Sequence, residues 1–120
     1  MTEENAKKFA QAWLQSFNSH DLDEILSHYA EDVEFTSPIV IRLNYDASGT
    51  IYGKQALRAY LQKGLAAFPD LKFEFYHALA GVNSVTLYYR SINNMLAAEV
   101  MMFNPEGKVE RVLAHYTQGS

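Results

Sequence analysis

Apolar residues near the start of the chain recur every three to four positions, which is the spacing of one face of an α-helix. The first stripe predicts an amphipathic helix from Glu3 to Phe17 with Thr2 as its cap; it consists of Ala6, Phe9, Ala10, Trp13 and Phe17. A short second helix is predicted after Asp21, because Glu24 stands at the capping-box position. Its apolar residues are Leu22, Ile25, Leu26 and Tyr29.

A third stripe of this kind follows a long polar segment. Gly53 is predicted to open a helix that ends at Pro69-Asp70. The stripe consists of Leu57, Tyr60, Leu61, Gly64, Leu65 and Phe68. Residues 38–53 between the second and third helices are predicted to be an irregular connection, in which Ile39–Tyr45 forms either a strand or a flap.

The second half of the chain alternates apolar and polar residues with the period of two that is typical of β-strands. Strands are predicted at Glu31–Pro38, Leu71–Leu79, Val85–Ile92, Leu96–Phe103 and Val109–Thr117. The last four are joined by short segments rich in Gly, Asn and Pro, which favours antiparallel hairpins. Three helices and an antiparallel meander indicate an α+β fold in one domain, residues 1–120, with the helices on one face of a curved sheet.

Several of these strands carry apolar residues on both faces. In the fourth predicted strand, Leu96, Ala98, Val100 and Met102 share one face, and Ala97, Met101 and Phe103 share the other. Helices can cover only one face of such a sheet, so we expect a second copy of the chain to cover part of the other. The alternative is a single sheet with a few exposed apolar residues, which are common in monomers.

Composition narrows the class of protein. The chain has 120 residues, a net charge of −4 and no cysteine, which argues against a nucleic-acid partner and against disulfides or thiolate metal sites. Its N-terminal segment is polar and acidic, unlike a signal peptide, and no apolar run approaches the length that spans a membrane. We therefore expect a cytoplasmic protein without a membrane partner.

Glu99 is the residue that most strongly suggests chemistry. It is the only charged residue between Leu96 and Phe103. Glu99 shares a face with Ala97, Met101 and Phe103, which would shield it from water. A carboxyl group that is desolvated by apolar neighbours has a raised pKa, and it can act as a hydrogen-bond donor or general acid near neutral pH. The alternative is an ordinary ion pair with Arg111 or Arg90 across the strands.

Other polar residues give weaker signals. Ser37 shares a face with Phe35 and either ends the strand before Pro38 or donates a hydrogen bond from a pocket wall. The four histidines, His20, His28, His77 and His115, lack the spacing of a metal site, so we expect neither a metal nor a cofactor. His77 alternates with Phe73 and Phe75, which would place it on the inner face.

Three segments together resemble a known family: "WLQSFNSHDLDEILSHYAEDVEFTSP", "GKQALRAYLQKGLAAFPDLKFEF" and "EVMMFNPEGKVERVLAHY". They are similar to SnoaL-like and ketosteroid-isomerase-like domains of the nuclear transport factor 2 superfamily, which have a cystatin-like α+β cone. The resemblance implies a deep apolar pocket at the open end of the cone, dimerisation through the outer face of the sheet, and Ser37 pointing into the pocket.

The resemblance transfers the catalytic residues of ketosteroid isomerase only in part. The family's catalytic aspartate falls on Ser37, which cannot act as a carboxylate base. Its oxyanion-hole tyrosine falls on Trp13, whose indole N–H can still donate a hydrogen bond. Its protonated acid, a carboxyl group that an apolar site keeps neutral, falls on Glu99. One role of three is retained, so we do not expect a true ketosteroid isomerase. The polyketide-cyclase-like relatives use an acid in the pocket at about this place, and Glu99 could fill that role.

Two functions remain open from the sequence. The first is a dimeric protein that binds, or binds and transforms, a small apolar molecule with a carbonyl group. Glu99 would be its acid, Trp13 and Ser37 its polar helpers, and His77 a second acid or base. The predicted wall is Phe17, Tyr29, Phe35, Tyr60, Leu87, Tyr89, Met101, Val112 and Tyr116. The second is a non-catalytic binding or assembly module of the same fold.

Overall fold

Helix α1 (Glu3–Asn18) begins where the sequence predicts, because the Thr2 hydroxyl accepts a hydrogen bond of 3.0 Å from the backbone N–H of Asn5. The computed structural model describes residues 1–117. Helix α2 (Leu22–Leu26) is capped in the same way, since Asp21 accepts from the N–H of Glu24 at 3.2 Å. Both predicted caps are therefore confirmed, and with them the two N-terminal helices.

The connection after the first strand differs from the prediction. Neither a strand nor a flap forms at Ile39–Tyr45; instead Pro38–Arg42 is a short helix, α3. Pro38 fits the first helical position because its φ is fixed and the missing N–H is not needed there. Further along, Thr50–Tyr52 forms a strand, β2, which the sequence analysis missed. The structure thus has four α-helices within residues 1–117 instead of three.

The third predicted helix is helix α4 (Lys54–Ala67). Gly53 precedes it with a φ of 89°, a left-handed conformation that favours glycine. The inward stripe of the helix includes Leu57, Tyr60 and Leu61, which are all buried. Phe68 ends the helix and is followed by Pro69, as the pattern predicts.

One mixed sheet contains all six strands, in the order β2-β1-β6-β5-β4-β3. Strand β1 (Tyr29–Thr36) runs parallel to β6 (Val109–Tyr116), and every other pair is antiparallel. Strand β5 (Leu96–Phe103) has the predicted bounds, whereas β3 (Glu74–Gly81) starts later and β4 (Ser84–Arg90) ends earlier than predicted. The fold is the predicted cone-like α+β class.

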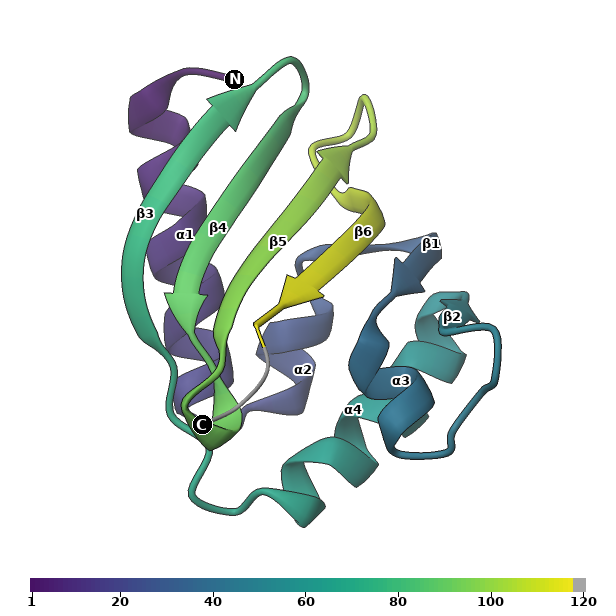
Figure 1. Cartoon of the computed structure of the whole chain (residues 1–120). Coiled ribbons are helices and arrows are strands. Elements are labelled where there is room, and N and C mark those ends of the chain that lie inside the picture. The colour runs from purple at the N-terminus through teal and green to yellow at the C-terminus, as the bar shows by residue number, and fades with distance from the viewer. Residues whose placement is uncertain (118–120) are drawn as a thin grey trace.

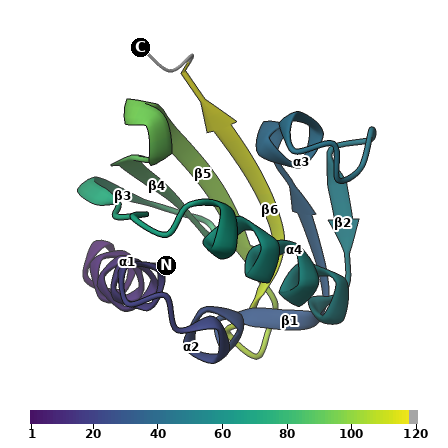
Figure 2. The ribbon, with the colours of Figure 1, turned by 90° about the horizontal axis from the view of Figure 1, so that it is seen from below.

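The helices gather on the concave side of this sheet. Figures 1 and 2 show α1 behind β3 and β4, and α4 crossing inside the curve of β6 and β1. Over the opposite face of β3 to β6, Figure 1 shows no helix of the described chain. None of the helices within residues 1–117 has both the length and the apolar character needed to cross a membrane.

The concave face carries the core. Along β5, Ala97, Glu99 and Met101 are buried, whereas the alternate residues are half-buried. The predicted placement of Glu99 on the inner, apolar face of its strand is therefore confirmed. Helix α1 and the sheet thus enclose a carboxyl group within a predominantly apolar interior.

Candidate functional site

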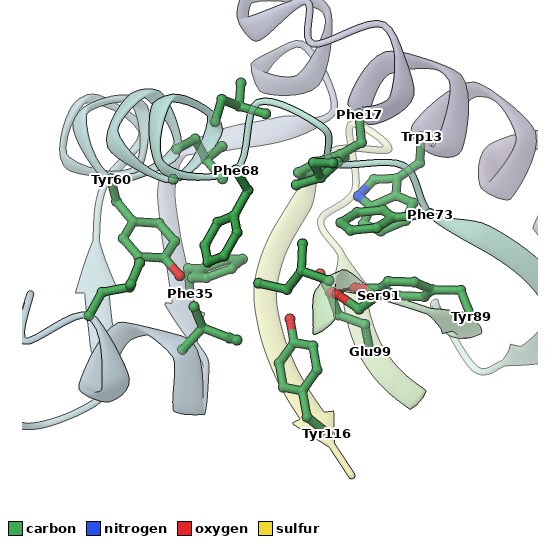
Figure 3. Close-up of a pocket in the computed structure, with 17 residues that line it drawn as sticks. Trp13, Phe17, Phe35, Tyr60, Phe68, Phe73, Tyr89, Ser91, Glu99 and Tyr116 are labelled. Carbon is green, nitrogen blue, oxygen red and sulfur yellow. Dashed lines mark hydrogen bonds between the residues drawn. The ribbon is translucent and has the colours of Figure 1, made fainter. Parts of the chain in front are cut away.

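A cavity of about 70 Å³ lies between the sheet, α1 and α4. Figure 3 shows aromatic side chains from these elements arranged around it. Its aromatic lining consists of Trp13, Phe17, Phe35, Tyr60, Phe68, Phe73, Tyr89 and Tyr116. The aliphatic residues and glycine in the wall are Ile39, Leu43, Leu61, Gly64, Leu65, Leu71 and Ile92, and Ser91 and Glu99 complete it. Glu99 is the only ionisable acid or base in this wall apart from the tyrosine phenols.

Glu99 is 3% exposed and is held by one neighbouring phenol. The hydroxyl of Tyr89 on β4 donates a hydrogen bond of 2.6 Å to Glu99 Oε1. Burial raises the pKa of Glu99 to about 7, although the Tyr89 hydrogen bond acts in the opposite direction. The carboxyl group is therefore largely protonated below pH 7 and can donate its own proton through Oε2. Its partner is Tyr89, and the alternative of an ion pair with Arg111 or Arg90 is wrong.

Four phenols surround this acid. Burial, and then the charge of Glu99, raise the pKa values of Tyr29, Tyr60, Tyr89 and Tyr116 above the ordinary value. Hydrogen-bonding interactions with Tyr89 and Ser37 act in the opposite direction on the pKa of Tyr116. All four phenols stay neutral at physiological pH, so they supply hydrogen-bond donors and no negative charge.

Trp13 lines the cavity but has no free donor. Its Nε1–H donates to the hydroxyl of Tyr29 at 3.1 Å, and both side chains are buried. The ring packs against Phe17 and Tyr89, with centroids 4.7 and 5.2 Å away. Trp13 therefore forms an apolar wall, and its predicted role as a polar helper is not supported by this geometry.

Ser37 is buried behind the cavity and is not part of its wall. Its hydroxyl accepts a hydrogen bond of 3.2 Å from the N–H of Ile39 and so caps α3. The sequence left open whether Ser37 ends the strand before Pro38 or donates a hydrogen bond from a pocket wall, and the first interpretation applies. The prediction that Ser37 points into the pocket is wrong, because Ser37 does not line the cavity and contacts it only through a hydrogen bond with Tyr116, which does.

His77 lies on the outer face of the sheet, away from the cavity. It pairs with Tyr88, stacks on that ring at 6.3 Å and is exposed. A β-bulge between Phe75 and His77 adds one residue to β3, so the simple alternation from Phe73 places His77 on the wrong face. His77 therefore cannot serve as a second acid or base in this cavity.

The predicted wall is correct in part. Phe17, Phe35, Tyr60, Tyr89 and Tyr116 line the cavity. The other four residues are buried but pack in the core outside the lining: Tyr29, Leu87, Met101 and Val112. Sequence periodicity identifies an inward face but not how far along it a cavity extends, so these four could not be separated from the rest.

Phe68, Ser91 and Ile92 also line the cavity, although the sequence did not assign them to its wall. Phe68 closes the apolar stripe of α4 and could have been found from that stripe. Ser91 and Ile92 were predicted to lie in a strand, but they belong to the link between β4 and β5, where Ile92–Asn94 forms a 3₁₀ turn, η1. No group of three potential metal ligands occurs within residues 1–117.

The sequence matches the model of the SnoaL-like domain over residues 10–118. A SnoaL-like protein of unknown function from Burkholderia thailandensis is 42% identical, with a TM-score of 0.93 and 98% of each chain covered. The chain therefore belongs to the SnoaL-like family. No curated protein is similar enough to count as a match.

Two more distant structures share the fold. One is SalBIII, an epoxide hydrolase/cyclase-like enzyme with a role in pyran ring formation in the polyether salinomycin. It is 21% identical, with a TM-score of 0.76, and the match covers 97% of this chain and 93% of that chain. The other is a protein of unknown function from Cytophaga hutchinsonii that is like nuclear transport factor 2. It is 13% identical, with a TM-score of 0.72 and coverage of 93% and 89%.

Proposed function

We propose that this protein binds a small, neutral, apolar molecule with a carbonyl group and transforms it by acid–base chemistry of the isomerase or cyclase type. The observation that carries this proposal is the Glu99 carboxyl group, buried in an aromatic cavity and held by Tyr89 at 2.6 Å. Among residues 1–117, no Lys, Arg or His lines the cavity. An anionic ligand would find no counter-charge there and would lose its hydration on entry.

The proposed chemistry uses neutral Glu99 as the donor. Tyr89 occupies Oε1, so the proton on Oε2 is directed at the carbonyl oxygen of the ligand. This polarises the carbonyl and acidifies the hydrogen on the adjacent carbon. A water molecule takes up that proton as the enol forms, and the resulting hydronium ion returns a proton to the Glu99 carboxylate. As charge develops on Glu99, the Tyr89 hydroxyl stabilises it, because hydrogen bonds to a charged acceptor are stronger than neutral ones.

Exchange of hydrogen for deuterium next to a ketone tests this chemistry without knowledge of the natural substrate. The wild-type protein is expected to accelerate the exchange of cyclopentanone in D₂O, followed by NMR, and Glu99→Gln is expected to abolish the acceleration. The matched control is Glu106→Gln, which changes an exposed glutamate in a turn. The rate should fall as pH rises through about 7. Unchanged exchange in Glu99→Gln would remove Glu99 from the mechanism.

The second candidate is a binding module without catalysis. It is favoured by Ser37, which stands where the related isomerases carry a carboxylate base, and by a cavity of about 70 Å³ that is largely filled by aromatic rings. Trp13 is the only tryptophan and lines the cavity, so its emission reports occupancy. Saturable emission changes without any hydrogen exchange would support this second function.

We also propose a homodimer that forms through the outer face of the sheet. On this face Val100 and Leu113 face each other across β5 and β6 and are half-buried, and Leu79 on β3 is 56% exposed. An uncovered antiparallel face normally carries polar residues. Contiguous apolar residues on such a face mark an interaction surface.

Light scattering after size-exclusion chromatography tests the dimer. The wild-type protein is expected to elute with twice the mass of one chain, and Leu113→Arg is expected to elute as a monomer, because the charge would be buried without a partner. Ile41→Arg is the matched control, since Ile41 is an exposed apolar residue of α3. A wild-type monomer, or an intact dimer in Leu113→Arg, would contradict this interface.

A further inference from the structure

A second hollow adjoins the cavity that contains Glu99. It has a volume of about 370 Å³ and lies between the end of α4 and the link from β4 to β5. The two hollows share the side chains of Phe68, Ser91 and Ile92. These three residues, which we call the collar, therefore lie where the two hollows adjoin.

The inner cavity is smaller than most ligand sites, with a volume of about 70 Å³. Ligand sites in proteins usually measure ~300–1,000 Å³. A ligand of that usual size with its head at Glu99 would extend past the collar, and the outer hollow is the adjoining space.

The two hollows differ in chemistry. The inner one is aromatic and aliphatic with Glu99 at its wall, whereas the outer one presents Asp70, Lys72 and Asn93. These three side chains are exposed, and neither Asp70 nor Lys72 forms an ion pair within the described part of the chain. Opposite charges in one small hollow favour neither an anion nor a cation. A hydroxyl group suits them, because it can donate to Asp70 and accept from Lys72.

The two large side chains of the collar are only half-buried. Phe68 is half-buried at the end of α4, where the helix stops, and Ile92 is half-buried in the short η1 turn. Figure 3 shows the Phe68 ring between Tyr60 and Phe35 on one side and Phe73 on the other. Because Phe68 lines both hollows, its ring stands at the junction between them.

We infer that the ligand has two parts: a narrow apolar head with the carbonyl group in the inner cavity, and a neutral hydroxylated tail in the outer hollow. Phe68 turns aside when the ligand enters, so it sets how large a head can pass. This inference rests on the proposed function, because it takes the inner cavity to be a ligand site. It adds Asp70 and Lys72 as binding residues and Phe68 as a residue that determines specificity.

Matched ketones test the two parts separately. Cyclopentanone represents the head alone, and 3-butylcyclopentanone and 3-(3-hydroxypropyl)cyclopentanone add chains of equal length that end in a methyl or a hydroxyl group. Trp13 emission is titrated for each, with thermal melting as a second readout. The hydroxyl-ended compound is expected to bind about fivefold tighter than the butyl compound, as one or two net hydrogen bonds would give.

Variants assign the tail to the outer hollow. Lys72→Ala and Asp70→Ala are expected to reduce the affinity for the hydroxyl-ended compound to that for the butyl compound. Lys8→Ala, an exposed lysine of α1 away from both hollows, should change nothing. Phe68→Ala is expected to tighten the binding of bulkier heads such as cyclohexanone, and Phe68→Leu provides a milder change if the alanine variant does not fold.

The outcomes separate this inference from the function on which it rests. If cyclopentanone binds but the hydroxyl group adds nothing, or if its advantage survives in Lys72→Ala and Asp70→Ala, the two-part ligand is overturned and the carbonyl pocket stands. If a chain that ends in a carboxylate or an ammonium group binds tighter than the hydroxyl-ended one, the neutral tail is wrong. If no ketone binds to the wild type or to Phe68→Ala, both proposals fail.

Discussion

The free energy of unfolding of the wild-type protein is expected to fall by roughly 3 kcal/mol between about pH 4 and about pH 8 on account of Glu99 alone. The pKa of this group rises from 4.5 to about 7 on folding, and each unit of difference corresponds to about 1.36 kcal/mol. Below pH 4.5 the carboxyl group is protonated in both states and costs nothing. Above pH 7 folding must bury its charge, so stability is lost progressively between these two values.

Urea unfolding across this pH range, in the wild type and in Glu99→Gln, measures the contribution. The variant lacks the titrating group, so the difference between the two curves isolates it from all others. His28 makes the subtraction necessary: burial lowers its pKa, so its contribution to stability rises with pH, opposite in sign to that of Glu99. A difference curve that is flat from about pH 4 to about pH 8 would mean that Glu99 is not desolvated as described.

Replacement of Tyr89 by Phe is expected to reduce stability by roughly 1–3 kcal/mol at about pH 8 and by less at about pH 5. At the higher pH, Glu99 is charged and would lose the donor that contacts Oε1 at 2.6 Å, and an unsatisfied buried charge is costly. At the lower pH Glu99 is neutral, so the loss of the Tyr89 hydrogen bond reduces the free energy of unfolding by less. The pKa of Glu99 should therefore rise above about 7, because the Tyr89 hydrogen bond normally lowers it.

The same unfolding experiment measures this effect, with Tyr60→Phe as the control. Tyr60 also lines the cavity and has a raised pKa, but no hydrogen bond links it to Glu99 within residues 1–117. The double variant Tyr89→Phe with Glu99→Gln closes a thermodynamic cycle for the pair. An equal loss of stability at both pH values would indicate lost packing of Tyr89 instead of a hydrogen bond to a titrating acid.

Most helices and strands, and the faces that they bury, could be predicted from the spacing of apolar residues alone, with α3 and β2 as the exceptions. The caps of α1 and α2 depend on side chains within three residues of the helix start, so Thr2 and Asp21 revealed them. The position of Glu99 followed from alternation along β5, which is regular from Leu96 to Met102. These features are local, and local spacing is the information that a sequence displays directly.

Where alternation is interrupted, the sequence misled. A β-bulge in β3 places His77 on the outer face of the sheet. The alternation from Phe73 to His77 gives no sign of the extra residue. The role of Ser37 depended on whether the strand ended there or continued. It ended, and Ser37 became the cap of α3 instead of a pocket residue.

The partners of the site residues became visible only in the folded chain. The donor to Glu99 is a phenol on the neighbouring strand, and Trp13 is occupied by Tyr29 from β1. The collar joins Phe68 at the end of one helix to Ile92 in a distant turn. Such contacts depend on how helices settle on the curved sheet, and no periodicity in the chain encodes where two remote side chains meet. The acid could be found from the sequence, whereas the partners and the space around it required the folded chain.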